Sequence, residues 1–204
     1  ELVRAIFGLD PIVDGEVTFA GDADRGASVP YRIAQGFGML SEDRKEEGLA
    51  TSLSIAENAT LSRLSPLSRF GVLDLGARDR RTAELIERLS IRCRGPGQVV
   101  GDLSGGNQQK VAFARLIHQD ADVLLLDEPT RGVDVGSKVE MYRLIGELAA
   151  SGKAVLFVSS YVPELLGVCD RIAVMHRGVL GEPRPAADWD EAKILDEAAR
   201  GGAA

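Results

Sequence analysis

The second half of the chain alternates short apolar runs with amphipathic stretches, and this alternation limits the possible folds more than any other feature. Residues 122–126 predict a buried strand, Val135–Ala150 an amphipathic helix and Ala154–Val158 a second buried strand. A short helix at Val162–Val168 and a strand at residues 171–175 continue the series. Short apolar strands separated by helices are typical of a parallel sheet covered on both faces. The sequence therefore predicts an α/β fold.

The first half predicts a more mixed set of elements. In residues 1–8 apolar side chains recur at i, i+4, which predicts a helix with Gly8 as its C-terminal stop. Residues 16–20 alternate like a half-exposed strand, and residues 36–40 form an apolar run typical of a buried strand. A charged loop follows the second strand, and residues 54–92 are helical in character.

The size and charge of the chain narrow its class. The 204 residues are enough for one domain with a sizeable core. Acidic side chains outnumber basic ones by 31 to 24, for a net charge of −7. Because nonspecific nucleic-acid binding normally needs a basic surface, no nucleic-acid partner is expected. No apolar stretch approaches the roughly 20 residues of a membrane helix, so any membrane contact is expected to go through a partner.

Two adjacent carboxylates, Asp127 and Glu128, follow the predicted strand at residues 122–126. Open parallel sheets bind their ligands at the carboxyl ends of their strands. In a nucleotide hydrolase the first carboxylate holds Mg²⁺, often through water, and the next accepts a hydrogen bond from the attacking water. The structural alternative is an acidic N-cap of the following helix.

A second motif, residues 103–110, lies just upstream and runs into a helix predicted at residues 108–118. Ser104 offers a hydroxyl, and Gly105 and Gly106 let backbone N–H groups approach an anion without interference from a Cβ. The positive end of the helix dipole adds to this attraction. Alone, such a sequence is often only a tight turn and cap, but a hydrophobic strand ending in Asp-Glu-Pro-Thr at this spacing makes it highly specific.

Together these motifs resemble those of ABC ATPases, the ATP-binding cassettes of ABC transporters. Residues 103–108 resemble the signature motif, residues 123–128 the Walker B strand, and residues 132–134 the D-loop. The resemblance implies a RecA-like P-loop NTPase core with a parallel sheet, an antiparallel β subdomain and an α-helical subdomain that carries the signature. It implies one ABC ATPase domain over residues 1–204, with the helical subdomain inserted at about residues 50–110.

The resemblance also implies the site and its ligands, ATP and Mg²⁺. In the family two cassettes face each other, and each ATP lies between the Walker A loop of one and the signature of the other. Glu128 corresponds to the catalytic carboxylate, and Asp127 to the one that meets Mg²⁺, mainly through water. The residues expected to face nucleotide are Ser104, Gly105, Gly106, Asn107, Gln108, Asp127, Asp134, Glu42 and Ser160. Of these, Asp134 can sense the opposite site, cap the helix that begins near Val135, or do both.

Three departures from the usual family pattern indicate a particular branch. Glu42 stands where most members have glutamine, Ser160 stands where a histidine is expected, and the signature continues as Asn-Gln-Gln-Lys at residues 107–110. Together these resemble the C-terminal cassette of duplicated ATPases that serve bacterial importers of ribose, galactose or xylose. In that class the two substitutions are the expected form of the second half.

The Walker A pattern Gly-x-x-x-x-Gly-Lys-Ser/Thr does not occur in the 204 residues. Residues 1–8 resemble the first turns of the helix that follows this loop in the family. The simplest expectation is a sequence truncated before Glu1, without the N-terminal strands and the Walker A loop. A cassette that naturally lacks the loop is the alternative.

The expected function is that of an ATP-hydrolysing energy module of a sugar importer at the cytoplasmic face of the plasma membrane. Its expected partners are a second cassette, the transmembrane permease and, indirectly, a periplasmic sugar-binding protein. Two alternatives stay open: a non-catalytic regulatory half that supplies the signature in trans, and a soluble ABC ATPase unrelated to transport.

Overall fold

A computed structural model describes residues 1–200 of the chain, apart from the side chain of Lys45. The chain divides into two compact units, Glu1–Leu156 and Phe157–Ala204, and each is described by itself. The single domain expected over residues 1–204 stays a prediction. None of the described helices is long and apolar enough to cross a membrane.

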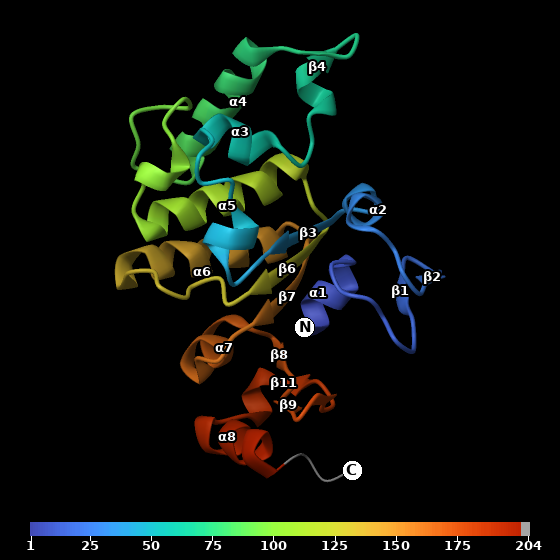
Figure 1. Cartoon of the computed structure of the whole chain (residues 1–204). Coiled ribbons are helices and arrows are strands. Elements are labelled where there is room, and N and C mark those ends of the chain that lie inside the picture. Colours follow the sequence, from blue (N-terminus) through green and yellow to red (C-terminus); the bar gives the residue numbers. More distant parts are fainter. Residues whose placement is uncertain (201–204) are drawn as a thin grey trace. The chain divides into compact units, whose positions relative to one another are not determined.

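A parallel sheet forms the centre of the first unit. It contains β3 (Phe37–Leu40), β6 (Val123–Asp127) and β7 (Ala154–Val158), in the order β3-β6-β7 (Figure 1). β3 and β6 pair in parallel, with Phe37 opposite Val123 and Leu40 opposite Leu126. The carboxyl ends of both strands therefore meet at one edge of the sheet. The parallel sheet confirms the fold class predicted from the sequence.

The first helix, α1 (Leu2–Phe7), packs against this sheet. Val3 and Phe7 form one apolar cluster with Phe37 of β3 and Leu125 of β6. The helix ends because Gly8 adopts a left-handed conformation, with φ 86°. The helix and its glycine stop are as predicted.

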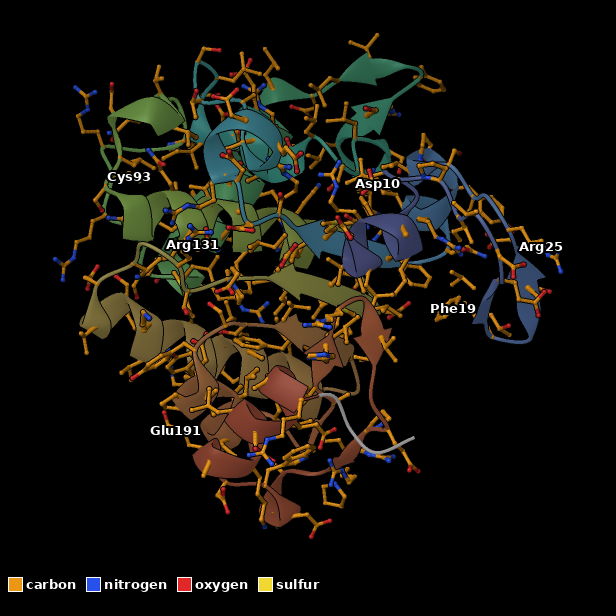
Figure 2. The ribbon with its side chains drawn as sticks, turned by 60° about the horizontal axis from the view of Figure 1, so that its bottom comes forward. Asp10, Phe19, Arg25, Cys93, Arg131 and Glu191 are labelled. Carbon is orange, nitrogen blue, oxygen red and sulfur yellow. The ribbon has the colours of Figure 1, made fainter. Side chains whose placement is uncertain are left out.

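A hairpin and a short helix follow α1. β1 (Val17–Phe19) pairs antiparallel with β2 (Asp22–Asp24), and α2 (Val29–Ala34) leads into β3. Figure 2 shows Phe19 on this hairpin, and its ring meets the ring of Phe37 edge-to-face at 4.8 Å between centroids.

Residues 50–120 contain three α-helices of the first unit. They are α3 (Ile55–Thr60), α4 (Leu75–Arg88) and α5 (Gly105–Gln119), and α3 packs against α5. Ser54 and Glu57 form a reciprocal capping box that fixes the start of α3. The fully buried Asn58 holds its turn by accepting from the N–H of Ala50 at 2.9 Å.

The stretch expected to be helical over residues 54–92 is interrupted. A single helical turn, Ser65–Leu67, is followed by a small antiparallel hairpin of β4 (Ser68–Arg69) and β5 (Val72–Leu73). Phe70 and Gly71 turn the hairpin with positive φ angles of 52° and 78°. Glycine adopts this conformation without strain and so ends the helical pattern. Short helical turns also occur at Arg44–Gly48 and Val100–Asp102.

α6 (Val135–Ala150) and β7 have the predicted bounds, but β7 is not buried as expected. Its residues alternate between exposed and half-buried, and Leu156 and Val158 remain exposed. The physical reason is that successive side chains of a strand point to opposite faces, and the face that carries Leu156 and Val158 is only partly covered.

The second unit has its own small core of Val162, Ile172, Val174, Trp189 and Ile194. Its helices are α7 (Val162–Val168), as predicted, and α8 (Glu191–Arg200), and Ala186–Asp188 forms a helical turn. The single strand expected over residues 171–175 is wrong. β8 (Arg171–Ile172) pairs with β11 (Arg184–Pro185), whereas β9 (Met175–His176) pairs with β10 (Val179–Leu180). The positive φ of Arg177 and Gly178 turns the chain into this second pairing.

Candidate functional site

Asp127 and Glu128 stand at the carboxyl end of β6. Both side chains are half-buried, between the buried strand and the surface. Burial raises the pKa of Asp127, and the negative charge of Glu128 raises it further. Glu128 has a left-handed φ of 44°, which is costly for a residue with a Cβ. The chain thus turns sharply at Glu128, and both carboxylates lie at the edge where parallel sheets bind ligands.

These carboxylates fit a magnesium ion that is held mainly through water and phosphate. No group of three or more His, Cys, Asp or Glu side chains within residues 1–200 is arranged to hold a metal by itself. Mg²⁺ usually keeps several waters and binds one or two carboxylates together with phosphate oxygens. Asp127 at the sheet edge is compatible with that arrangement.

The turn after Glu128 is anchored to α5. Gln109, on the first turns of that helix, donates from Nε2 to the carbonyl oxygen of Pro129 at 2.6 Å. Gln109 and Thr130 are both almost completely buried. The helix that carries the Ser-Gly-Gly motif is therefore directly bonded to the segment that carries the carboxylates.

The first turn of α5 presents the backbone predicted to face an anion. Ser104 precedes the helix, and its hydroxyl accepts from Asn107 Nδ2 at 2.9 Å instead of capping a backbone N–H. The side-chain oxygen of Asn107 in turn accepts from the N–H of Arg92 at 2.8 Å. The first N–H groups of a helix have no partner within the helix and can bind anions.

Gly106 lies where α5 approaches the start of α6. A Cβ at this position would lie 2.7 Å from Ser137 Oγ and 3.1 Å from Asp134 Oδ2. Only glycine leaves room for this contact. Asp134 caps α6 by accepting from the Ser137 N–H at 3.0 Å, and hydrogen bonds from Ser137 lower its pKa. The capping role considered for Asp134 is thus present.

The charged segment after β3 reaches the same place. Glu42 forms an ion pair with Arg131, which Figure 2 labels in the segment between β6 and α6. Arg44 donates from Nη1 to the carbonyl oxygen of Gly105 at 3.0 Å. Arg44 is half-buried, and this burial lowers the pKa of its guanidinium. The sheet edge, the first turn of α5 and the start of α6 therefore form one site within the first unit.

Two predicted residues have other surroundings. Gln108 is buried, and its Nε2 donates to the carbonyl oxygen of Leu103 at 3.1 Å, so it braces the turn before α5. Ser160 belongs to the second unit and is exposed just after β7. The structure describes Ser160 within that unit only.

The sequence did not reveal the roles of two residues that hold the site together, Gln109 and Arg44. Gln109 precedes the buried Phe113 by four residues, which places both side chains on the same face of a helix. This spacing was the available signal that Gln109 is buried. Arg44 sits in a run of charges, where the default expectation is exposure to solvent, and no pattern distinguished it from its neighbours.

The fold and the site define an ATP-binding cassette. A model of the ABC transporter family matches residues 1–131, which include Glu42, the Ser104–Gln108 motif and both carboxylates. The chain belongs to the ABC transporter family.

Its similar curated relatives are named for sugar import. The chain is 46% identical over 195 residues to the ribose import ATP-binding protein RbsA of Pseudomonas putida, covering 96% of this chain and 38% of that protein. It is 49% identical over 196 residues to ribose import ATP-binding protein RbsA 3 of Rubrobacter xylanophilus, covering 96% and 39%. The chain thus spans less than half the length of these relatives.

Solved structures share the fold. A dimeric ATP-binding cassette in a post-hydrolysis state with ADP and Pi superposes with a TM-score of 0.75 at 22% identity, over 91% of this chain and 79% of that one. A nucleotide-free cassette from an ABC transporter gives 0.72 at 19% identity, over 96% and 77%.

Proposed function

We propose that this chain is the part of an importer's ATPase subunit that contributes a signature motif and a pair of carboxylates to ATP hydrolysis. The cargo is a sugar, since the curated relatives are named for ribose import. One observation carries the proposal: the first turn of α5 and the Asp127–Glu128 edge belong to one bonded site, through Gln109 and Pro129.

The residues of this site act on two different ATP molecules, since the carboxylates serve the ATP of their own cassette and the Ser104–Gly106 turn serves the ATP of a second cassette. Glu128 accepts a hydrogen bond from the water that attacks the γ-phosphate and polarises it. Asp127 orients the waters around Mg²⁺, which when bound neutralises charge on the phosphates. Ser104, Gly105 and Gly106 present their hydroxyl and N–H groups to the γ-phosphate of an ATP held by a second cassette.

The remaining predicted residues act around this centre. Asn107 orients the Ser104 hydroxyl through its 2.9 Å hydrogen bond, and Gln108 supports the backbone of the same turn. Asp134 caps α6 beside Gly106, where the D-loop of one cassette faces the other. The partners are a second cassette, a permease in the plasma membrane and a periplasmic sugar-binding protein, with the chain at the cytoplasmic face.

A regulatory half that supplies the signature without turning over ATP is the second candidate. The ion pair between Glu42 and Arg131 favours it, because that pair engages the side chain at the position where most family members have glutamine.

The Glu128→Gln substitution in the complete ATPase subunit separates the two candidates. Removing the carboxylate charge while keeping its shape should lower ATP turnover and sugar transport about a hundredfold or more, in the range of general-base losses. Glu147→Gln is the matched control, because Glu147 is exposed on α6 and far along the chain from the site. Unchanged turnover in Glu128→Gln would refute the catalytic role and leave the regulatory candidate.

A further inference from the structure

Arg44 contacts two backbone segments of the site. Its Nη1 donates to the carbonyl oxygen of Gly105 at 3.0 Å. On its other side, a Cβ placed on Gly132 would lie 3.3 Å from Arg44 Nη2. The start of α5 and the turn that leads to Asp134 also meet directly, since a Cβ on Gly105 would lie 3.3 Å from the carbonyl oxygen of Gly132 and 3.7 Å from Arg44 Nη2. The guanidinium therefore packs beside this contact and touches both segments.

The segment that carries Arg44 is itself fastened to its surroundings. Glu47 accepts from Arg4 of α1 at 2.6 Å and from the Ser41 hydroxyl at 2.8 Å. Glu42 pairs with Arg131, beyond the carboxyl end of β6. Residues 41–48 are thus bonded to α1, to the segment after Glu128 and, through Arg44, to α5.

In this arrangement Arg44 can hold two backbone segments in a fixed relative position. A planar guanidinium holds its donors in a fixed fork, so it can bond one neighbour while its other edge packs on a second. A lysine at the same position offers a single point charge on a flexible stem. An arginine therefore braces the contact between the first turn of α5 and the Gly132 turn in a way that a lysine cannot.

We propose that Arg44 is a positioning residue, which holds the Ser104–Gly106 backbone at the orientation needed to meet the γ-phosphate of an opposing ATP. Arg44 acts through Gly105 and touches no nucleotide itself. The inference rests on the proposed function, because it assigns Arg44 to the same site.

The first test needs no nucleotide. Backbone hydrogen exchange over residues 103–112 is compared between wild type, Arg44→Ala and Arg143→Ala, together with urea unfolding of each. Loss of a charge-assisted hydrogen bond should speed exchange in this segment about tenfold in Arg44→Ala, with little change in the unfolding midpoint. Arg143 is an exposed arginine of α6 that pairs with Glu147 on the same helix, so Arg143→Ala should match wild type.

The second test measures ATP turnover in the complete subunit assembled with its permease. Arg44→Ala should lower kcat about ten- to a hundredfold while the KM for ATP changes less than about twofold, since a misplaced group costs rate more than binding. Arg44→Lys keeps the charge and should recover part of the loss.

Unchanged exchange and unchanged kcat in Arg44→Ala would overturn the inference, as would a loss of turnover that follows an equal loss of stability. The failure of the proposed function is recognised separately. If Ser104→Ala also leaves turnover intact, the signature role itself fails. If Ser104→Ala abolishes turnover and Arg44→Ala does not affect it, only the positioning role fails.

Discussion

Gly106 shows at the residue scale why this site is built on glycine. Gly106 is buried in the first turn of α5, and it admits the Asp134–Ser137 cap of α6 at close range. The Ser137 hydroxyl already donates to Asp134 Oδ2 at 2.8 Å, so it cannot turn away without losing that bond.

A methyl group at this position should therefore separate the two helices. We expect Gly106→Ala to lower ATP turnover of the complete subunit at least about tenfold and to cost about 1 kcal/mol of stability through the lost Ser137–Asp134 bond. Gly146→Ala is the control, because Gly146 lies in α6 with open space around its Cβ position, and it should be neutral or slightly stabilising.

The double substitution Gly106→Ala with Ser137→Ala tests the mechanism of this loss. Removing the hydroxyl removes the closest clash, so part of the turnover should return, whereas the stability lost with the Ser137–Asp134 bond should not. If the double variant turns over ATP no faster than Gly106→Ala, the clash with Ser137 is not the cause.

The residues of the site differ in how far the sequence reveals them. Asp127, Glu128 and the Ser104–Gly106 run follow from the order of a buried strand and a glycine-containing helix start. Gln109 and Arg44 do not, because their roles depend on which backbone oxygens, those of Pro129 and Gly105, come within reach after folding.

At the scale of elements, Arg32 joins the β1–β2 hairpin to the sheet. This arginine of α2 is fully buried, pairs with Asp24 of β2 at 2.7 Å and lies over the Phe37 ring of β3 at 5.2 Å. One side chain thus connects the hairpin, a helix and a strand.

Removing Arg32 should loosen this corner of the first unit. Arg32→Ala is expected to lower the free energy of unfolding by roughly 3 kcal/mol, because it removes the ion-pair partner of Asp24 and opens a cavity beside Phe37. Urea unfolding of this chain measures the change. Arg25→Ala should stay within about 0.5 kcal/mol, since Arg25 is exposed on the neighbouring loop (Figure 2). Equal losses in both variants would contradict this role of Arg32.

Sequence pattern located the long elements well and the short ones poorly. The bounds of α6, β7 and α7 are as predicted, because the spacing of apolar residues is regular along the whole of each element. The β4–β5 hairpin and the split of residues 171–175 into β8 and β9 were missed. A strand of two residues is too short to show an alternation of polar and apolar side chains. The pairing of such strands depends on turns at Gly71 and Gly178.

At the scale of the whole molecule, the first unit alone holds every predicted site residue except Ser160. The fold class was predictable because an ABC cassette is specified by the order of its strands, helices and motifs. The exposure of β7 was not, because the apolar composition of a strand does not reveal whether both of its faces are covered.

The central claim is that the start of α5 acts on an ATP held by a second cassette. The most direct test is the rate of ATP hydrolysis by the complete, permease-bound subunit carrying Ser104→Ala, with the exposed Ser52→Ala as control. We predict that Ser104→Ala lowers the rate at least about tenfold, as expected for loss of a hydrogen bond made to a charged group, and that Ser52→Ala matches wild type. An unchanged rate in Ser104→Ala would contradict the claim.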